Sequence, residues 1–411
     1  MFNIQVARDD LLLALQAVSS TVGDNSQGLG DNCISITDLG NNFIQVYTSN
    51  SVEFSSVEIV LTKGSAGKSE RMPFIEFKRF KTIIESIPKG EYVNIKASTN
   101  DIEIDYKTFG NKGKPIKLTG ATNGMIPLPT FTTPTDLLCI DTILIKNSID
   151  KICSIIKNDP NNQYSGCFKI STDQYNVDFI SIDNKNNRMC LCSGTNTNVN
   201  KGDMFLEADK FKKAFKQLFM EYDDIYMETN GNINRIMGNT KISSSSTILY
   251  SPTYYTRVLN ATFPPVIKSM FDNVNDFVEI DKDELTASLI RIGAIEDNVI
   301  GAGTMELKIH NNVIDIIKTS QYGIVEDSFD TNTESSVSFN EVFKAKPLAE
   351  ILKNFQSTPD VAYSHSSFEI GVGTNSVNNT NYYVLKEGSC KGSIDTKFLI
   401  IGLGQQTPNN P

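Results

Sequence analysis

The side chains best suited to catalysis in this sequence are not arranged for it. The chain has two histidines, His310 and His365, and neither stands near a serine or cysteine in a nucleophile motif. A solvated side chain is therefore the favoured interpretation of both. Cys190 and Cys192 would share one face of a strand, but no second cysteine pair stands at zinc-site spacing. We favour a partly buried strand over a metal site.

Other arrangements that support chemistry are missing as well. The stretches Gly371-Val-Gly-Thr374 and Gly402-Leu-Gly404 are not phosphate-binding loops, because the motif Gly-x-x-x-x-Gly-Lys-Ser/Thr does not occur. No pair of carboxylates stands out for acid–base catalysis. These observations predict a protein that is not an enzyme and that holds no metal and no cofactor.

Size and composition narrow the classes that remain. At about 150 residues per domain, 411 residues suggest about three domains. The net charge of −10 excludes a protein that is basic over its whole surface, but a local basic surface stays possible. The apolar runs are too short to span a membrane, and the N-terminus lacks the order of a signal peptide. Seven scattered cysteines predict a reducing, cytoplasmic setting without a disulfide framework.

The strongest signal is an internal repeat of a strand followed by a helix. Residues 2–6 alternate apolar and polar, Asp9 and Asp10 stand where a helix N-terminus favours acids, and Leu11–Leu15 begin a helical spacing. The same order recurs five times. Helices are predicted to begin near residues 9, 77, 142, 208, 282 and 341. This spacing of about 65 residues suits a unit of one helix and several strands.

The segments between the predicted helices alternate with period two between Asn, Gly and Ser turns, as antiparallel strands do. We therefore predict an α+β fold of three tandem domains, each built from two half-units of one helix on antiparallel sheet. The predicted domains span residues 1–130, 135–271 and 276–404, and residues 405–411 form a mobile tail.

Positive charge gathers on these helices, because four of the six predicted helix stretches are net positive in an acidic chain. In residues 209–219, Phe211 and Phe215 share an apolar face, whereas Lys210, Lys213 and Lys216 are displaced from it. One such helix is most simply a solvated surface. Repeated in equivalent units, such helices would form a positive surface that holds a phosphate backbone without recognising bases.

The order of these segments resembles the bacterial sliding clamp, the beta subunit of the replicative DNA polymerase. The resemblance covers essentially the whole chain, and no single motif is specific by itself. The segments that carry it are Phe2–Val18, Ile83–Gly90, Phe179–Asp183 with Arg188 and Met189, Arg257–Pro264, Phe339–Asn340 and Phe398–Leu403.

The resemblance implies a head-to-tail homodimer that closes a ring of helices around double-stranded DNA, with the sheets outside. Contacts to DNA would be independent of base sequence. The residues expected to face DNA are Lys78, Lys81, Lys151, Tyr164, Lys210, Lys213 and Lys346. The residues expected at the dimer joint are Ile116, Leu118, Ala294 and Ile295.

The resemblance also implies a cleft between the second and third domains that binds short peptides of DNA polymerase and of the clamp loader. The residues expected in this partner cleft are Ile182, Met189, Pro264, Lys268, Ser269, Leu399 and Ile401. Two departures from the family pattern fall here. The Asp183-to-Arg188 spacing is longer by two residues, and Gly402 stands where the family has Pro.

Two other classes stay open at this stage. A structural or carbohydrate-binding multi-strand protein of a viral tail or surface would explain the turns rich in Asn, Ser and Thr, but not the basic helices. A nuclease or other replication enzyme is disfavoured, because no clustered Asp/Glu metal motif is present.

Overall fold

The structure is a computed structural model that describes residues 2–23, 30–50, 52–62, 70–108, 111–112, 114–122, 127–131, 136–156, 166–173, 175–186, 188–196, 201–238, 249–259, 263, 267–293, 303–355, 367–375, 380–387 and 394–402. The chain forms two compact units. Unit 1 comprises Met1–Ile145, Thr197–Gly202 and Asp209–Leu259, and unit 2 comprises Lys146–Asn196, Asp203–Ala208 and Asn260–Pro411.

Unit 1 contains two antiparallel sheets. The smaller has the order β1-β6-β7-β8, with β9 also paired to β7, and the larger has the order β10-β15-β16-β17-β4-β3-β2-β5. The strands of the smaller sheet are β1 (Phe2–Ala7), β6 (Tyr92–Ala97), β7 (Asp101–Thr108), β8 (Asn111–Lys112) and β9 (Ile116–Thr119). Those of the larger are β2 (Cys33–Gly40), β3 (Phe43–Ser49), β4 (Phe54–Val60), β5 (Ile75–Glu76), β10 (Asp136–Asp141), β15 (Asp224–Asn230), β16 (Ile233–Gly238) and β17 (Tyr250–Arg257).

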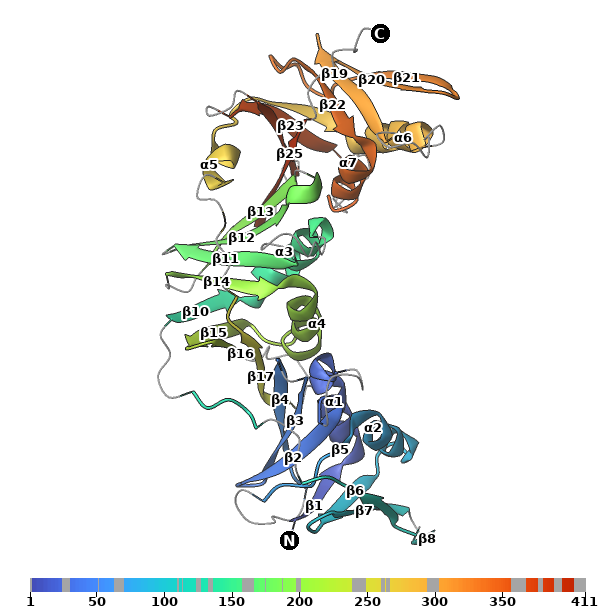
Figure 1. Ribbon diagram of the computed structural model, residues 1–411, viewed down its shortest axis with the longest axis vertical. Coiled ribbons are helices and arrows are strands. Elements are labelled where there is room, and N and C mark those ends of the chain that lie inside the picture. The colour runs from blue at the N-terminus through green and yellow to red at the C-terminus, as the bar shows by residue number, and fades with distance from the viewer. Residues whose placement is uncertain are drawn as a thin grey trace. The chain divides into compact units, whose positions relative to one another are not determined.

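Three α-helices accompany these sheets: α1 (Arg8–Val18), α2 (Phe77–Ser86) and α4 (Ala208–Leu218), and the short helix η1 (Ser19–Thr21) follows α1. They lie on one side of the strands of unit 1 (Figure 1). Helix α4 shows why these residues are helical. Asp209 stands in its first turn and Lys216 in its last, which suits the helix dipole, while Phe211 and Phe215 are buried against the strands.

Unit 2 repeats this plan with an eight-stranded sheet, β14-β11-β12-β13-β25-β24-β23-β18, and a four-stranded sheet, β21-β20-β19-β22. The strands of the first are β11 (Cys167–Asp173), β12 (Asn176–Asp183), β13 (Arg188–Thr195), β14 (Gly202–Glu207), β18 (Phe277–Asp281), β23 (Ser367–Thr374), β24 (Asn381–Glu387) and β25 (Ile394–Ile401). Those of the second are β19 (Thr304–His310), β20 (Val313–Ser320), β21 (Gly323–Asp330) and β22 (Phe339–Lys344).

Four α-helices accompany these sheets: α3 (Thr142–Ile155), whose residues from Lys146 on belong to unit 2, α5 (Ile267–Asp272), α6 (Lys282–Gly293) and α7 (Ala345–Leu352). The short helix η2 (Asn184–Asn186) lies between β12 and β13. Helices α3 and α7 lie on one side of the eight-stranded sheet and α5 on the other (Figure 1). The six predicted helices are α1, α2, α3, α4, α6 and α7, so these predictions are confirmed. Helix α5 was not predicted, because six residues are too few to show helical periodicity.

Matching turns support the repeat. The hairpin β2–β3 turns at Asn41 and Asn42, and the hairpin β19–β20 turns at Asn311 and Asn312, all four with positive φ between 51° and 67°. Two consecutive residues with positive φ are what a tight hairpin turn requires, and Asn tolerates this conformation better than most residues. The α+β class and the antiparallel sheets are as predicted. In the described part of the chain, no helix is both long and apolar enough to cross a membrane.

Candidate nucleic-acid interface and partner cleft

Exposed lysines project from three helices, two in unit 1 and one in unit 2. Lys78 is exposed on α2, Lys213 on α4 and Lys346 on α7. Lys81 on α2 is partly exposed, with its Nζ 3.7 Å from a carboxylate oxygen of Glu85. These lysines occupy the solvent side of helices whose opposite sides are buried. Tyr164 lies outside the described residues.

Lys210 on α4 differs from its neighbours, because it reaches a buried acid. Its side chain is 44% exposed, and its Nζ lies 3.7 Å from Glu53, whose side chain is 3% exposed. Asn50 donates a hydrogen bond of 3.0 Å to the Glu53 carboxylate, and the Tyr254 hydroxyl donates another. Lys210 therefore joins α4 to the loop before β4 and remains only half available to a ligand.

Lys151 was predicted to face DNA, and the structure places it in the interior instead. It is 7% exposed, and its ammonium group donates to Glu387 Oε2 at 2.7 Å and to Thr396 Oγ1 at 3.0 Å. Its position on α3 turns toward β24 and β25 and away from solvent. Lys151 therefore connects α3 to strands β24 and β25, and it does not belong to the candidate DNA surface.

A second buried cation lies close by in unit 2. Arg188 at the start of β13 is fully buried, and its guanidinium donates to Asp183 at 2.8 Å and to Glu350 on α7 at 2.8 Å. Burial raises the pKa of Asp183, but hydrogen bonds from Asn186 and Arg188 outweigh burial, and the pKa lies below its usual value. The residue next to Arg188 is Met189, so this network fixes the strand that carries a predicted cleft residue.

Three predicted cleft residues lie side by side on adjacent strands. Ile182 on β12 is paired with Met189 on β13, and Met189 is paired with Leu399 on β25. Directly paired residues share one face of an antiparallel sheet, and Ile401 is two residues further along the same face. Ile182 and Leu399 are buried, whereas Met189 and Ile401 remain partly exposed. We call the four residues Ile182, Met189, Leu399 and Ile401 the cleft face.

Helix α5 lies against the cleft face. Phe271 of α5 and Phe263 before it belong to the same apolar cluster as Ile182 and Leu399. Lys268 and Ser269 are exposed on α5. Lys268 Nζ donates to Asp178 on β12 at 2.7 Å, and this hydrogen bond raises the pKa of the lysine. The structure thus brings six of the seven predicted cleft residues together in unit 2, and Pro264 lies outside the described residues.

The glycine at position 402 has a local reason. A Cβ atom there would lie 2.3 Å from the side chain of Glu341, which is buried beside the end of β25. Glu341 accepts hydrogen bonds from the Tyr383 hydroxyl and from the main-chain N–H of Val342, both at 3.0 Å. The close approach of these groups leaves no room for a larger residue at the end of the last strand.

The two smaller sheets have open edges within the described part of the chain. Strand β9 pairs with β7 alone, and β21 pairs with β20 alone. Ile116 and Leu118 of β9 are partly buried, and Ile324 of β21 is 62% exposed. Ala294 and Ile295, the other residues predicted at the dimer joint, lie outside the described residues. An open edge is a surface on which another strand can pair.

The residues considered for catalysis and metal binding do not form a site among the residues described. His310 is exposed, with Nδ1 3.5 Å from Asp315, and His365 lies outside the described residues. Cys190 and Cys192 are fully buried with sulfur atoms 3.9 Å apart. No group of three or more His, Cys, Asp or Glu side chains is placed to hold a metal ion in the described ranges.

No family model and no curated protein matches this sequence. Solved structures do match over nearly its whole length. The DNA polymerase III subunit beta of Pseudomonas aeruginosa has a TM-score of 0.77 at 11% identity, with 98% of this chain and 100% of that chain covered. The DNA polymerase III beta subunit of Thermotoga maritima has a TM-score of 0.72 at 14% identity, with 98% and 99% covered.

The Helicobacter pylori beta clamp, in a structure with a DNA ligase peptide, has a TM-score of 0.71 at 14% identity and covers 98% of this chain and 100% of that chain. These identities are too low for the sequences alone to establish kinship. The agreement in three dimensions extends from end to end of both chains. The protein therefore has the fold of the DNA polymerase III beta sliding clamps.

Proposed function

We propose that this protein is a sliding clamp, a non-enzymatic processivity factor that encircles double-stranded DNA and tethers a DNA polymerase to it. The observation that carries the proposal is the structural agreement with solved clamps, which covers 98% of this chain and 99% or more of each of those chains. Exposed lysines on α2, α4 and α7 provide cations suited to phosphate contacts. A cytoplasmic location and the absence of a cofactor belong to the same proposal.

The proposed DNA contacts involve Lys78, Lys81, Lys210, Lys213 and Lys346, with Tyr164 as a further expected contact. Each lysine would bind a phosphate group as a point charge, so affinity is weak, independent of sequence and steeply dependent on salt. Each lysine replaced by Glu should lower the slope of log affinity against log salt concentration by about 1.

The test is retention of the protein on a nicked circular plasmid at low salt, followed by gel filtration before and after the plasmid is linearised. A clamp stays on the circle and leaves the linear molecule. Lys213→Glu should reduce retention, whereas Lys185→Glu, an equal charge change at an exposed residue of η2, should not. Equal retention on circular and linear DNA would contradict the ring.

The proposed ring is a head-to-tail homodimer in which β9 of one protomer pairs with β21 of the other. The two edges have opposite charge, since Lys114 and Lys117 are exposed at β9 and Glu326 and Asp330 are exposed on β21. Ile116 and Leu118 on β9 and Ile324 on β21 supply apolar contacts. Complementary edges of this kind favour a closed assembly of two chains.

Sedimentation equilibrium tests the homodimer. Lys117→Glu should weaken the dimer by like-charge repulsion with Glu326, and Lys117→Glu combined with Glu326→Lys should restore it. A monomer at all concentrations, or a charge swap that restores nothing, would contradict the pairing of these edges.

We further propose that the cleft face binds a short linear peptide of DNA polymerase or of the clamp loader. The Helicobacter pylori clamp was solved with a DNA ligase peptide, and that peptide is a suitable first ligand. Truncation of the partly exposed Met189 to Ala should cost about 1–3 kcal/mol of binding. A chain that ends at Gly404 tests whether residues 405–411, which lie outside the described residues, obstruct the site.

A further inference from the structure

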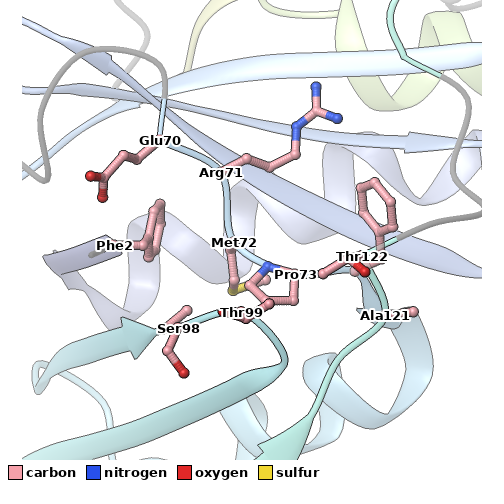
Figure 2. Close-up of a pocket in the computed structure, with 11 residues that line it drawn as sticks. Phe2, Glu70, Arg71, Met72, Pro73, Ser98, Thr99, Ala121 and Thr122 are labelled. Atoms are coloured by element: carbon pink, nitrogen blue, oxygen red, sulfur yellow. The ribbon is translucent and has the colours of Figure 1, made fainter.

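A pocket of about 550 Å³ opens in unit 1, in a different unit from the cleft face. It lies where the segment 70–74 passes between the start of β1 and the ends of β6 and β9 (Figure 2). Phe2, Met72 and Phe74 line it and are buried, while Ser98 and Thr122 line it and are exposed. An apolar floor with polar groups at the rim is the usual composition of a ligand site.

Among the described residues that line this pocket, Arg71 is the cation. Arg71 is exposed, with its Cζ atom 5.4 Å from the centre of the Tyr47 ring and 5.8 Å from that of the Phe74 ring. Contacts with two aromatic rings hold a guanidinium in place without neutralising it. Among the described residues, no carboxylate forms an ion pair with Arg71. Figure 2 shows the Glu70 carboxylate on the opposite side of the segment from Arg71.

Segment 70–72 pairs with β2 along one edge, and its opposite edge at Arg71 is open within the described part of the chain. Asp38 N–H donates to Glu70 C=O and Met72 N–H donates to Ile36 C=O, both at 2.8 Å, so segment 70–72 pairs with β2. In this pairing Arg71 opposes Thr37 without hydrogen bonds between them, and its own N–H and C=O point away from β2. Neither group makes a hydrogen bond within the described part of the chain.

A strand already uses this edge a little further along. Phe74 exchanges two hydrogen bonds of 2.7 and 2.8 Å with Ala121, on the side that does not face β2. Thr122 follows Ala121 directly and lines the pocket. A peptide strand bound beside Arg71 would therefore lie on the same edge of segment 70–74 as Ala121 does. It would pass over the apolar floor of the pocket, formed by Phe2, Met72 and Phe74.

We propose that this pocket is a second peptide site, which takes an extended segment of a partner protein with an apolar side chain for the floor and acidic residues at the Arg71 end. Main-chain hydrogen bonds to Arg71 provide affinity, and the floor and the guanidinium provide specificity. The proposal does not depend on the clamp function. If both hold, one protomer can hold two partners at once, one at this pocket and one at the cleft face.

The test uses fluorescein-labelled peptides and the full chain. The acidic peptide is acetyl-Thr-Val-Phe-Val-Asp-Asp-amide, together with its reversed sequence, because the direction of the bound strand is open. The matched peptides carry Asn-Asn in place of Asp-Asp. Fluorescence polarisation should show saturable binding of an acidic peptide at about 10 µM to 1 mM, and at least about fivefold weaker binding of its Asn twin.

Two variants alter the pocket and two serve as controls. Arg71→Glu should weaken binding of the acidic peptide about tenfold or more, and Thr122→Trp, which fills the pocket from its exposed rim, should abolish it. Lys89→Glu makes a comparable change at an exposed residue outside the pocket and should bind as the wild type does, as should Met189→Ala.

Three outcomes would overturn the proposal: no saturable binding, equal binding to wild type and both pocket variants, or loss of binding in Met189→Ala alone. A fourth is tighter binding of a single-stranded oligothymidylate with the same dependence on Arg71, which would assign the pocket to nucleic acid. None of these results changes the retention assay on circular DNA, so the two proposals fail independently.

Discussion

The cations of this protein occupy two contrasting environments. Arg188 and Lys151 are buried in unit 2 and each is held by at least one carboxylate within 2.8 Å. Lys78, Lys213 and Lys346 are exposed on helices and belong to the proposed DNA surface. The comparison teaches that exposure decides which lysines are candidates for the DNA surface. A distant acid holds Lys151 in the interior, whereas Lys210 stays half exposed beside Glu53.

The largest effect is expected where the buried network has most partners. Arg188→Met should lower the free energy of unfolding by about 3–5 kcal/mol, because the Asp183 and Glu350 carboxylates lose their shared cation. Chemical denaturation measures this change. Lys185→Met, three residues earlier and exposed, should leave stability unchanged within about 0.5 kcal/mol. Equal free energies of unfolding for Arg188→Met and Lys185→Met would contradict the stabilising role given to the buried ion pairs.

Lys151 tests the comparison most directly. Lys151→Met should cost about 3 kcal/mol of unfolding free energy, because the Glu387 carboxylate, only 10% exposed, is left without its cation. Adding Glu387→Gln to the same chain should recover part of the loss. A variant of full stability that is retained less on circular DNA would return Lys151 to the DNA surface.

A close contact gives a smaller effect. Gly402→Ala should destabilise the protein by about 1–3 kcal/mol, since its methyl group meets the buried Glu341 side chain. Glu341→Ala in the same chain makes room for that methyl group. Thermal unfolding of the single and double variants should therefore show non-additive losses, and strictly additive losses would argue against the contact.

The pH dependence of stability separates the two environments. The pKa of Asp183 is lowered in the folded state, so its contribution is complete above the unfolded value of about 3.9 and is lost as pH falls below it. Between about pH 6 and pH 3, the wild type should lose more stability than Asp183→Asn, which is already less stable at neutral pH. Parallel losses in both proteins would contradict the role given to this carboxylate.

The smallest effect on stability is expected at the exposed lysines. Lys78→Glu, Lys213→Glu and Lys346→Glu should each change the free energy of unfolding by less than about 0.5 kcal/mol. The same variants should lower retention on circular DNA. A large loss of stability in any of them would place that lysine with Arg188 and Lys151.

The periodic parts of the molecule could be predicted from sequence, and the pairings between distant parts could not. Six helices and the strands between them follow from local patterns, such as the acids before Leu11 and the phenylalanines of α4. Lys151 was misplaced because its partner, Glu387, is 236 residues away and nothing in the local sequence indicates it. The family pattern grouped Ile182, Met189 and Leu399, which are distant in sequence and are paired neighbours on β12, β13 and β25. Their role as a peptide cleft stays a prediction.

Other features carried no usable sequence signal. Arg71 is one arginine next to a glutamate, and its importance depends on Tyr47 and Phe74 from two other segments. The need for glycine at 402 depends on Glu341, which lies 61 positions earlier in the numbering of the chain. Such constraints arise from packing between segments, and a single sequence records only their result.

The position of β25 sets the order in which unit 2 can mature during synthesis. This strand contains residues 394–401, close to the end of the chain, yet it lies between β13 and β24 in the middle of its sheet. Strand β13, made about 200 residues earlier, must therefore keep an unpaired edge until β25 has been synthesised. A chain interrupted before residue 394 would leave that edge open to pairing with another strand.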